Sequence, residues 1–98
     1  MHVELLRGAE ADLLEVYVRL EEVRPGLGER FYRTLDAAFE RLPNYPEMAP
    51  VYRGVYRRLV LRPFGFGIFY AIESDRLMVG AILDLRQDPE SIERRLSR

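Results

Sequence analysis

Three arginines near the ends of expected strands, Arg58, Arg62 and Arg86, are the side chains of this sequence best suited to chemistry. A guanidinium keeps its charge at neutral pH and can hold a phosphate through two parallel hydrogen bonds. Asp84, two residues before Arg86, could act as a base only with a raised pKa, and a neighbouring guanidinium lowers the pKa of a carboxyl group. An ion pair between Asp84 and Arg86, or a solvated strand end, is the more ordinary interpretation.

The length of 98 residues predicts a single domain spanning residues 1–98, because two separate cores would both be too small to be stable. Hydrophobic residues make up 48% of the chain and charged residues 32%, which are the proportions of a globular protein. The sequence has no run of about 18 apolar residues and no basic-then-apolar leader. We therefore expect a cytoplasmic protein that does not enter a membrane.

The composition also restricts the chemistry. The sequence has no cysteine, and its single histidine, His2, stands beside the N-terminus. Disulfides and thiolate metal sites are therefore excluded, and we expect no metal and no other cofactor. The formal net charge of −1 gives no overall attraction to nucleic acid, so a nucleic-acid role would need a local arginine patch.

Hydrophobic periodicity and turn residues predict an α+β order of one strand, two helices and a three-stranded antiparallel meander. The expected bounds are 3–6 for the first strand, 9–23 and 27–42 for the helices, 43–53 for an ordered loop, and 56–62, 66–73 and 76–85 for the meander. The linker between the helices is so short that they should form an antiparallel hairpin.

The first predicted helix carries two apolar residues outside its main apolar stripe. Leu14 and Val18 lie roughly 100–140° away from the stripe that contains Leu13 and Val16, at about 100° per residue. They are either ordinary exposed apolar residues or a second contact face for a partner. The second helix has one clean apolar stripe and a mostly charged opposite face, which is typical of a helix that packs on one side only.

A two-residue turn at Ser74-Asp75 sets the expected register of the meander, because it pairs Glu73 with Arg76. One sheet face is then continuously apolar and should be covered by the helices; it comprises Ile68, Tyr70, Ile72, Leu77, Val79, Ala81 and Leu83. The opposite face is half apolar and should be open to water or to a partner; it includes Phe69, Met78 and Ile82.

Six short segments form a set whose order and spacing are more specific than any one of them. They are Ala11-Asp12-Leu13, Glu29-Arg30-Phe31, the LPNYP run at 42–46, Gly54 with Arg57-Arg58, the Phe69-Tyr70 pair, and Leu85-Arg86-Gln87-Asp88-Pro89. In this arrangement the chain resembles the RelE/ParE superfamily of bacterial type II toxins over nearly its whole length. The resemblance implies a strand, a two-helix antiparallel hairpin and a three-stranded meander, and an antitoxin, usually encoded next door, that wraps and blocks the toxin.

The resemblance implies one of two targets. ParE-like members inhibit DNA gyrase and are not enzymes, whereas RelE-like members are ribonucleases that cleave messenger RNA, typically on the ribosome. For a metal-independent nuclease the candidate catalytic residues are Arg58, Arg62, Arg86 and Asp84. Many relatives have a histidine where Asp84 stands, and Ile92 stands where a tyrosine or tryptophan would follow. Binding to ribosomal RNA favours a strongly basic protein, so the net charge of −1 favours the ParE-like target.

We therefore predict the toxin component of a type II toxin–antitoxin system that is ParE-like, directed at gyrase and neutralised by a cognate antitoxin. The antitoxin is expected to cover five apolar residues: Leu14, Val18, Phe69, Met78 and Ile82. The alternatives are a RelE-like messenger-RNA endonuclease and an inactive, non-toxic binding module on the same fold, for which a homodimer is one form.

The C-terminal segment at 89–98 allows two interpretations. It is either a short amphipathic helix with Ile92 and Leu96 on one side or a solvated chain end. If it docks, it should lie near the open face of the sheet, where an antitoxin would displace or order it.

Overall fold

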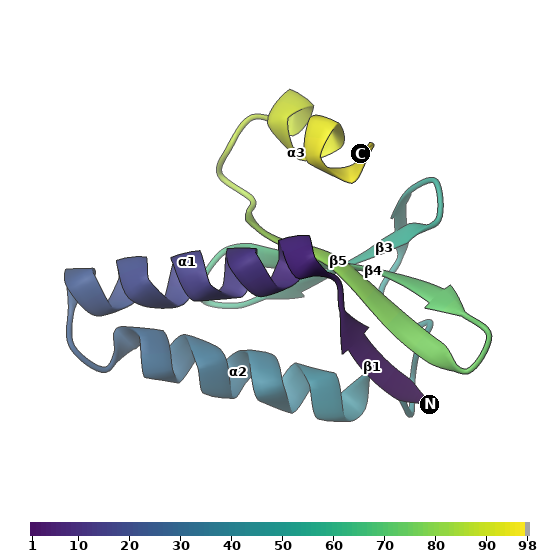
Figure 1. The fold of residues 1–98 in the computed structure, drawn as a ribbon, viewed down its shortest axis with the longest axis horizontal. Coiled ribbons are helices and arrows are strands. Elements are labelled where there is room, and N and C mark those ends of the chain that lie inside the picture. Colours follow the sequence, from purple (N-terminus) through teal and green to yellow (C-terminus); the bar gives the residue numbers. More distant parts are fainter. Residues whose placement is uncertain (98) are drawn as a thin grey trace.

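The computed structural model describes residues 1–97, which form an α+β fold with a five-stranded mixed sheet (Figure 1). The elements follow in the order β1 (His2–Leu5), α1 (Arg7–Val23), α2 (Leu27–Arg41), β2 (Val51–Arg53), β3 (Tyr56–Leu61), β4 (Phe66–Glu73), β5 (Arg76–Asp84) and α3 (Pro89–Leu96). The strand order in the sheet is β1-β5-β4-β3-β2, with β1 parallel to β5 and all other neighbours antiparallel. The predicted α+β class and the order of strand, helix hairpin and meander are confirmed.

Two elements extend the predicted order. The segment predicted as a loop at 43–53 ends in the short strand β2, which adds a fourth antiparallel strand at the edge of the sheet. The C-terminal segment is helical, as one of its two interpretations required: α3 begins at Pro89 after Asp88, whose Oδ1 accepts hydrogen bonds from the amides of Glu90 and Ser91 at 2.7 and 3.4 Å. An aspartate before a first-turn proline is a strong signal for the start of a helix.

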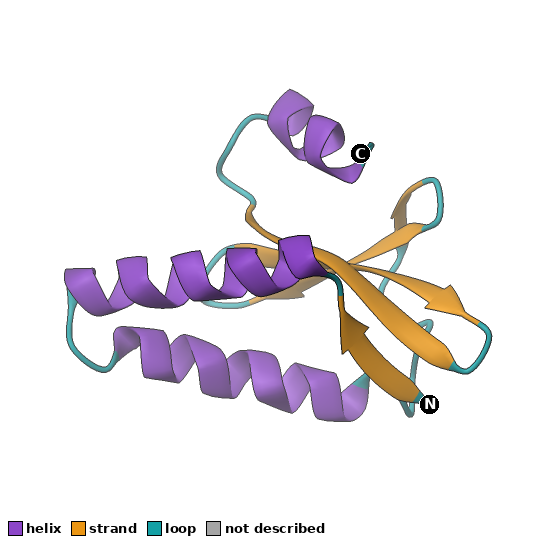
Figure 2. Cartoon of the chain, in the orientation of Figure 1, coloured by secondary structure: helices purple, strands orange, loops and turns teal. Residues whose placement is uncertain are grey.

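The helices cover both faces of the sheet (Figure 2). The α1–α2 hairpin packs on one face and forms the main apolar core there. In this core the ring of Phe31 from α2 contacts the rings of Phe64 and Phe66 edge-on, at centroid distances of 5.4 and 5.3 Å. On the other face α3 places Ile92 over a smaller cluster formed by Phe69, Ala81 and Leu83. The molecule therefore has three layers, with α3 covering much of the face that was expected to be open.

A β-bulge in β5 corrects the predicted register. The turn pairs Glu73 with Arg76 as predicted, but Tyr70 then pairs with Val79 and Phe69 with Ala81, so Gly80 is the extra residue. Because side chains alternate with a period of two, one inserted residue exchanges the two faces beyond it. The predicted faces were therefore wrong for the residues of β5 that follow Gly80. Ala81 and Leu83 belong to the α3 face, and Ile82 belongs to the core under α1 and α2.

Glu21 holds the tight connection between α1 and α2. Its carboxylate accepts hydrogen bonds from the amides of Gly26 and Glu29, all at 3.1 Å, and so supplies the cap that the first residues of α2 lack. The bond from the Gly26 amide is the main reason that the pKa of Glu21 is lowered. The next glycine lets the helices approach, because a Cβ at Gly28 would lie 2.6 Å from the carbonyl oxygen of Tyr17.

The Glu21 cap makes stability depend on pH in a predictable direction. A carboxyl group whose pKa is lowered by folding stabilises the folded state above its unfolded pKa, and this contribution disappears as pH falls through the folded pKa. Glu21→Gln should therefore lower Tm near neutral pH, and the difference from wild type should shrink as pH falls below the usual carboxyl range. Thermal unfolding between pH 7 and pH 3 measures this, with the exposed neighbour Glu22→Gln as control. An equal Tm for Glu21→Gln and Glu22→Gln at pH 7 would contradict the cap.

Candidate functional site

Asp84 and Arg86 form a closed ion pair at the end of β5. The Nε and Nη2 atoms of Arg86 donate to Oδ1 and Oδ2 of Asp84 at 2.8 and 3.1 Å, and the amide of Arg86 also donates to Oδ1 at 2.9 Å. The side-chain hydrogen bonds from Arg86 hold the pKa of Asp84 below its usual value, and Asp84 raises that of Arg86. The ion-pair interpretation is confirmed, and the carboxyl group is poorly suited to accept a proton.

The three candidate arginines do not meet on one surface. Arg58 pairs with Phe69 on the α3 face, and its guanidinium lies 4.8 Å from the centre of the Tyr52 ring. Arg86 lies 5.8 Å from the centre of the Phe66 ring, which belongs to the core on the opposite face. Arg62 is exposed in the turn that follows β3. Arg58 and Arg86 are thus engaged with rings that belong to clusters on opposite faces of the sheet.

Hydrogen bonds from side chains of β3 and β4 hold the loop that precedes β2 on the sheet. The hydroxyl of Tyr70 donates to the carbonyl oxygen of Pro46 at 2.7 Å, and Arg57 donates to the carbonyl oxygen of Ala49 at 2.8 Å. Burial raises the pKa of Tyr70, whose side chain is fully buried. Tyr70 is therefore a core residue, as its position in the register predicted. Arg57 pairs with Tyr70 and lies on the same face of the sheet, where its guanidinium is used in the hydrogen bond to Ala49.

A carboxylate that the sequence analysis did not single out as functional joins three elements. The carboxylate of Asp12 in α1 accepts hydrogen bonds from Nη1 and Nη2 of Arg95 in α3 at 2.7 and 2.8 Å. Its Oδ2 also accepts a hydrogen bond from the amide of Ile82 in β5 at 2.9 Å. The side chains of Arg95 and Asp12 are only 22% and 15% exposed. The sequence contained a signal for this role of Asp12. The residue stands four positions before the buried Val16, so it places a charged side chain on the apolar face of the helix.

A cleft of about 410 Å³ lies beside this cluster, between α1, the end of β5 and α3. Its lining combines Val16, Phe66 and Ile82 with charged side chains that are already paired with one another or with Arg86. Within residues 1–97 no group of three potential metal ligands occurs, and no helix there is long and apolar enough to cross a membrane.

The five residues expected under an antitoxin differ in accessibility. Leu14 and Val18 are 66% and 47% exposed, and Met78 is partly exposed. Phe69 and Ile82 are 0% and 1% exposed, so the expectation that they lie on an open face was wrong in this structure. Tyr52 and α3 cover Phe69, and the bulge at Gly80 turns Ile82 toward the core.

Removing the Asp12 carboxylate should loosen α3 and destabilise the protein. Asp12→Ala leaves the partly buried Arg95 without its partner and the amide of Ile82 without an acceptor, so we expect a loss of about 1–3 kcal/mol in the free energy of unfolding. Urea unfolding measures the loss, and hydrogen exchange should show faster exchange in α3. Glu15→Ala, which removes an exposed ion pair with Arg19, is the control. Equal stability of Asp12→Ala and Glu15→Ala would rule out a structural role for the cluster.

Comparisons with known proteins agree with one another. A family model described as the ParE toxin of the type II toxin–antitoxin system, parDE, matches residues 3–89. The chain is similar to Toxin ParE2 of Mycobacterium tuberculosis, in the strains CDC 1551 / Oshkosh and ATCC 25618 / H37Rv. Each is 28% identical over 92 residues, which cover 92% of this chain and 87% of the relative.

A solved structure gives the same picture at the level of the fold. A chain of the chromosomal ParDE TA system from P. aeruginosa superposes with a TM-score of 0.78 at 17% sequence identity. The match covers 88% of this chain and 97% of that chain.

Proposed function

Because the chain belongs to the ParE toxin family of type II toxin–antitoxin systems, we propose that it stops growth by inhibiting DNA gyrase. Its partner in such a system is a cognate antitoxin protein. We further propose that neutralisation occurs through the apolar residues that remain accessible on α1 and β5, namely Leu14, Val18 and Met78. Phe69 and Ile82 would join this contact only after α3 and the core had rearranged.

The closed pair of Asp84 and Arg86 is the observation that supports a binding mode of action over RNA cleavage. A nuclease that works without a metal needs a base for the 2′-hydroxyl group and cations around the phosphate. Arg86 lowers the pKa of Asp84, which makes the Asp84 carboxylate a weak base. Arg86 lies over the Phe66 ring, which belongs to the core, whereas Arg58 lies on the opposite face of the sheet. The net charge of −1 also disfavours docking on ribosomal RNA.

We expect the purified protein to block supercoiling of relaxed plasmid by gyrase while leaving messenger RNA intact in a translating extract. An equimolar amount of the protein encoded by the adjacent gene should restore supercoiling, because a type II antitoxin acts by binding its toxin. The heat-denatured protein is the control for non-specific inhibition.

The alternatives give different results in the same assays. Cleavage of messenger RNA that is lost in Arg86→Ala would replace the proposal by a RelE-like nuclease. A folded protein that neither slows growth on induction nor affects gyrase or RNA would be an inactive binding module.

A further inference from the structure

The outer side of α1 carries an apolar ridge that nothing in residues 1–97 covers. Leu14 and Val18 stand at positions i and i+4, so both project from the same side of the helix, opposite the buried Val16. Their exposed fractions of 66% and 47% are high for apolar side chains on a well-packed helix. On α2, Tyr32 adds a third exposed apolar group at 45%.

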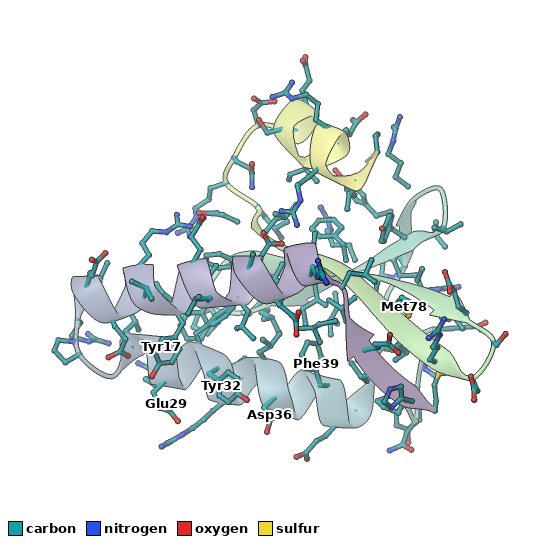
Figure 3. All side chains as sticks on the ribbon, in the orientation of Figure 1. Tyr17, Glu29, Tyr32, Asp36, Phe39 and Met78 are labelled. Atoms are coloured by element: carbon teal, nitrogen blue, oxygen red, sulfur yellow. The ribbon has the colours of Figure 1, made fainter. Side chains whose placement is uncertain are left out.

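Leu14 separates two shallow grooves. One, of about 400 Å³, runs between α1 and α2, and Figure 3 shows Tyr17, Glu29 and Tyr32 along it. The other, of about 480 Å³, runs along α1 on the far side of Leu14 and includes Val18. A helix packs on another helix by laying its ridges of side chains in such grooves. Apolar residues spaced three and four apart on a partner helix would therefore enter both grooves and straddle Leu14.

The rim of these grooves is acidic. Four glutamates line them, and the one guanidinium among the lining residues belongs to Arg19; the glutamates are Glu10, Glu15, Glu22 and Glu29. Two of the four carboxylates form ion pairs. Glu15 pairs with Arg19 at 3.2 Å, and Glu29 pairs with Arg33 at 3.3 Å. Glu29 also accepts a hydrogen bond from the hydroxyl of Tyr17 at 3.4 Å.

The remaining two carboxylates, Glu10 and Glu22, form no ion pair within the described part of the chain. They are 12 positions apart, which corresponds to about 18 Å along α1, so they bracket Leu14 and Val18. A purely apolar partner would bury this surface next to unpaired negative charges, which is unfavourable. A second copy of the same ridge would bring glutamates against glutamates, which disfavours self-association.

We propose that the antitoxin segment that covers α1 is a basic amphipathic helix, with its apolar stripe astride Leu14 and a lysine or arginine near each end to meet Glu10 and Glu22. This inference rests on the proposed function, because it assigns the chemistry of the antitoxin segment. Rim charges of this kind govern the rate and the salt dependence of association, while the central apolar contacts contribute most of the affinity.

The test measures the affinity of the protein encoded by the adjacent gene for this chain at low and high salt. Glu10→Gln/Glu22→Gln should weaken binding at low salt by about threefold to tenfold and make the affinity less dependent on salt. Leu14→Ala/Val18→Ala should weaken binding by about tenfold or more at both salt concentrations. The control is Glu40→Gln/Glu47→Gln, which removes two exposed glutamates elsewhere and should leave affinity and salt dependence unchanged. Circular dichroism spectra confirm that each variant is folded.

The possible failures are distinguishable. Tight binding that neither double variant alters would overturn this inference and leave the proposed function standing. A concentration-dependent dimer of the free protein that disappears in Leu14→Ala/Val18→Ala would assign the ridge to a second copy instead. If induction causes no arrest and the adjacent protein forms no complex, the proposed function fails and the inference fails with it.

Discussion

The Asp12 carboxylate is the contact on which the arrangement of the three layers depends. The parallel pairing of β1 with β5 ends at Leu5 and Val79, followed by one more bond from the amide of Leu6 to the carbonyl oxygen of Val79. Past that point α1 runs beside β5, and the carboxylate of Asp12 accepts a hydrogen bond from the amide of Ile82. The same carboxylate holds Arg95 and thereby fixes α3 on the far face. One side chain therefore satisfies a backbone donor of the sheet and joins a helix from each side.

Much of the fold was predictable because its signals are local. Both long helices were placed to within two residues, and β4 was placed at its observed bounds, because apolar spacing and turn residues are read within a few positions. A glycine inside a strand pattern, such as Gly80, favours either a bulge or the close approach of another segment, and it does not distinguish the two. A Cβ at this position would lie 2.7 Å from the hydroxyl oxygen of Tyr56, a residue 24 positions earlier in the chain. Such a clash exists only in the folded sheet, and this is why the faces of Ala81, Ile82 and Leu83 were assigned wrongly.

In the candidate site, too, local pairs were predictable from the sequence and distant pairs were not. The pairing of Asp84 with Arg86 was foreseen because the two residues are two positions apart. The pairing of Asp12 with Arg95 spans 83 positions, and it depends on how α3 crosses the sheet. The family match ends at residue 89, where α3 begins, so Arg95 lies outside the matched region. The last segment that carries the resemblance lies at the end of the meander, whereas the carboxylate that joins three elements stands on the first helix.

The position of β5 has a consequence for synthesis on the ribosome. This strand is the seventh of the eight elements in chain order, yet it lies between β1 and β4 in the sheet and pairs with both. Its first partner, β1, is made about 70 residues earlier and has no strand to pair with until β5 emerges. Contacts of such long sequence separation form late, because the intervening chain must first be ordered. Until β5 has been synthesised, the nascent chain therefore carries an incomplete sheet in which β1 has no partner, and the toxin fold cannot close.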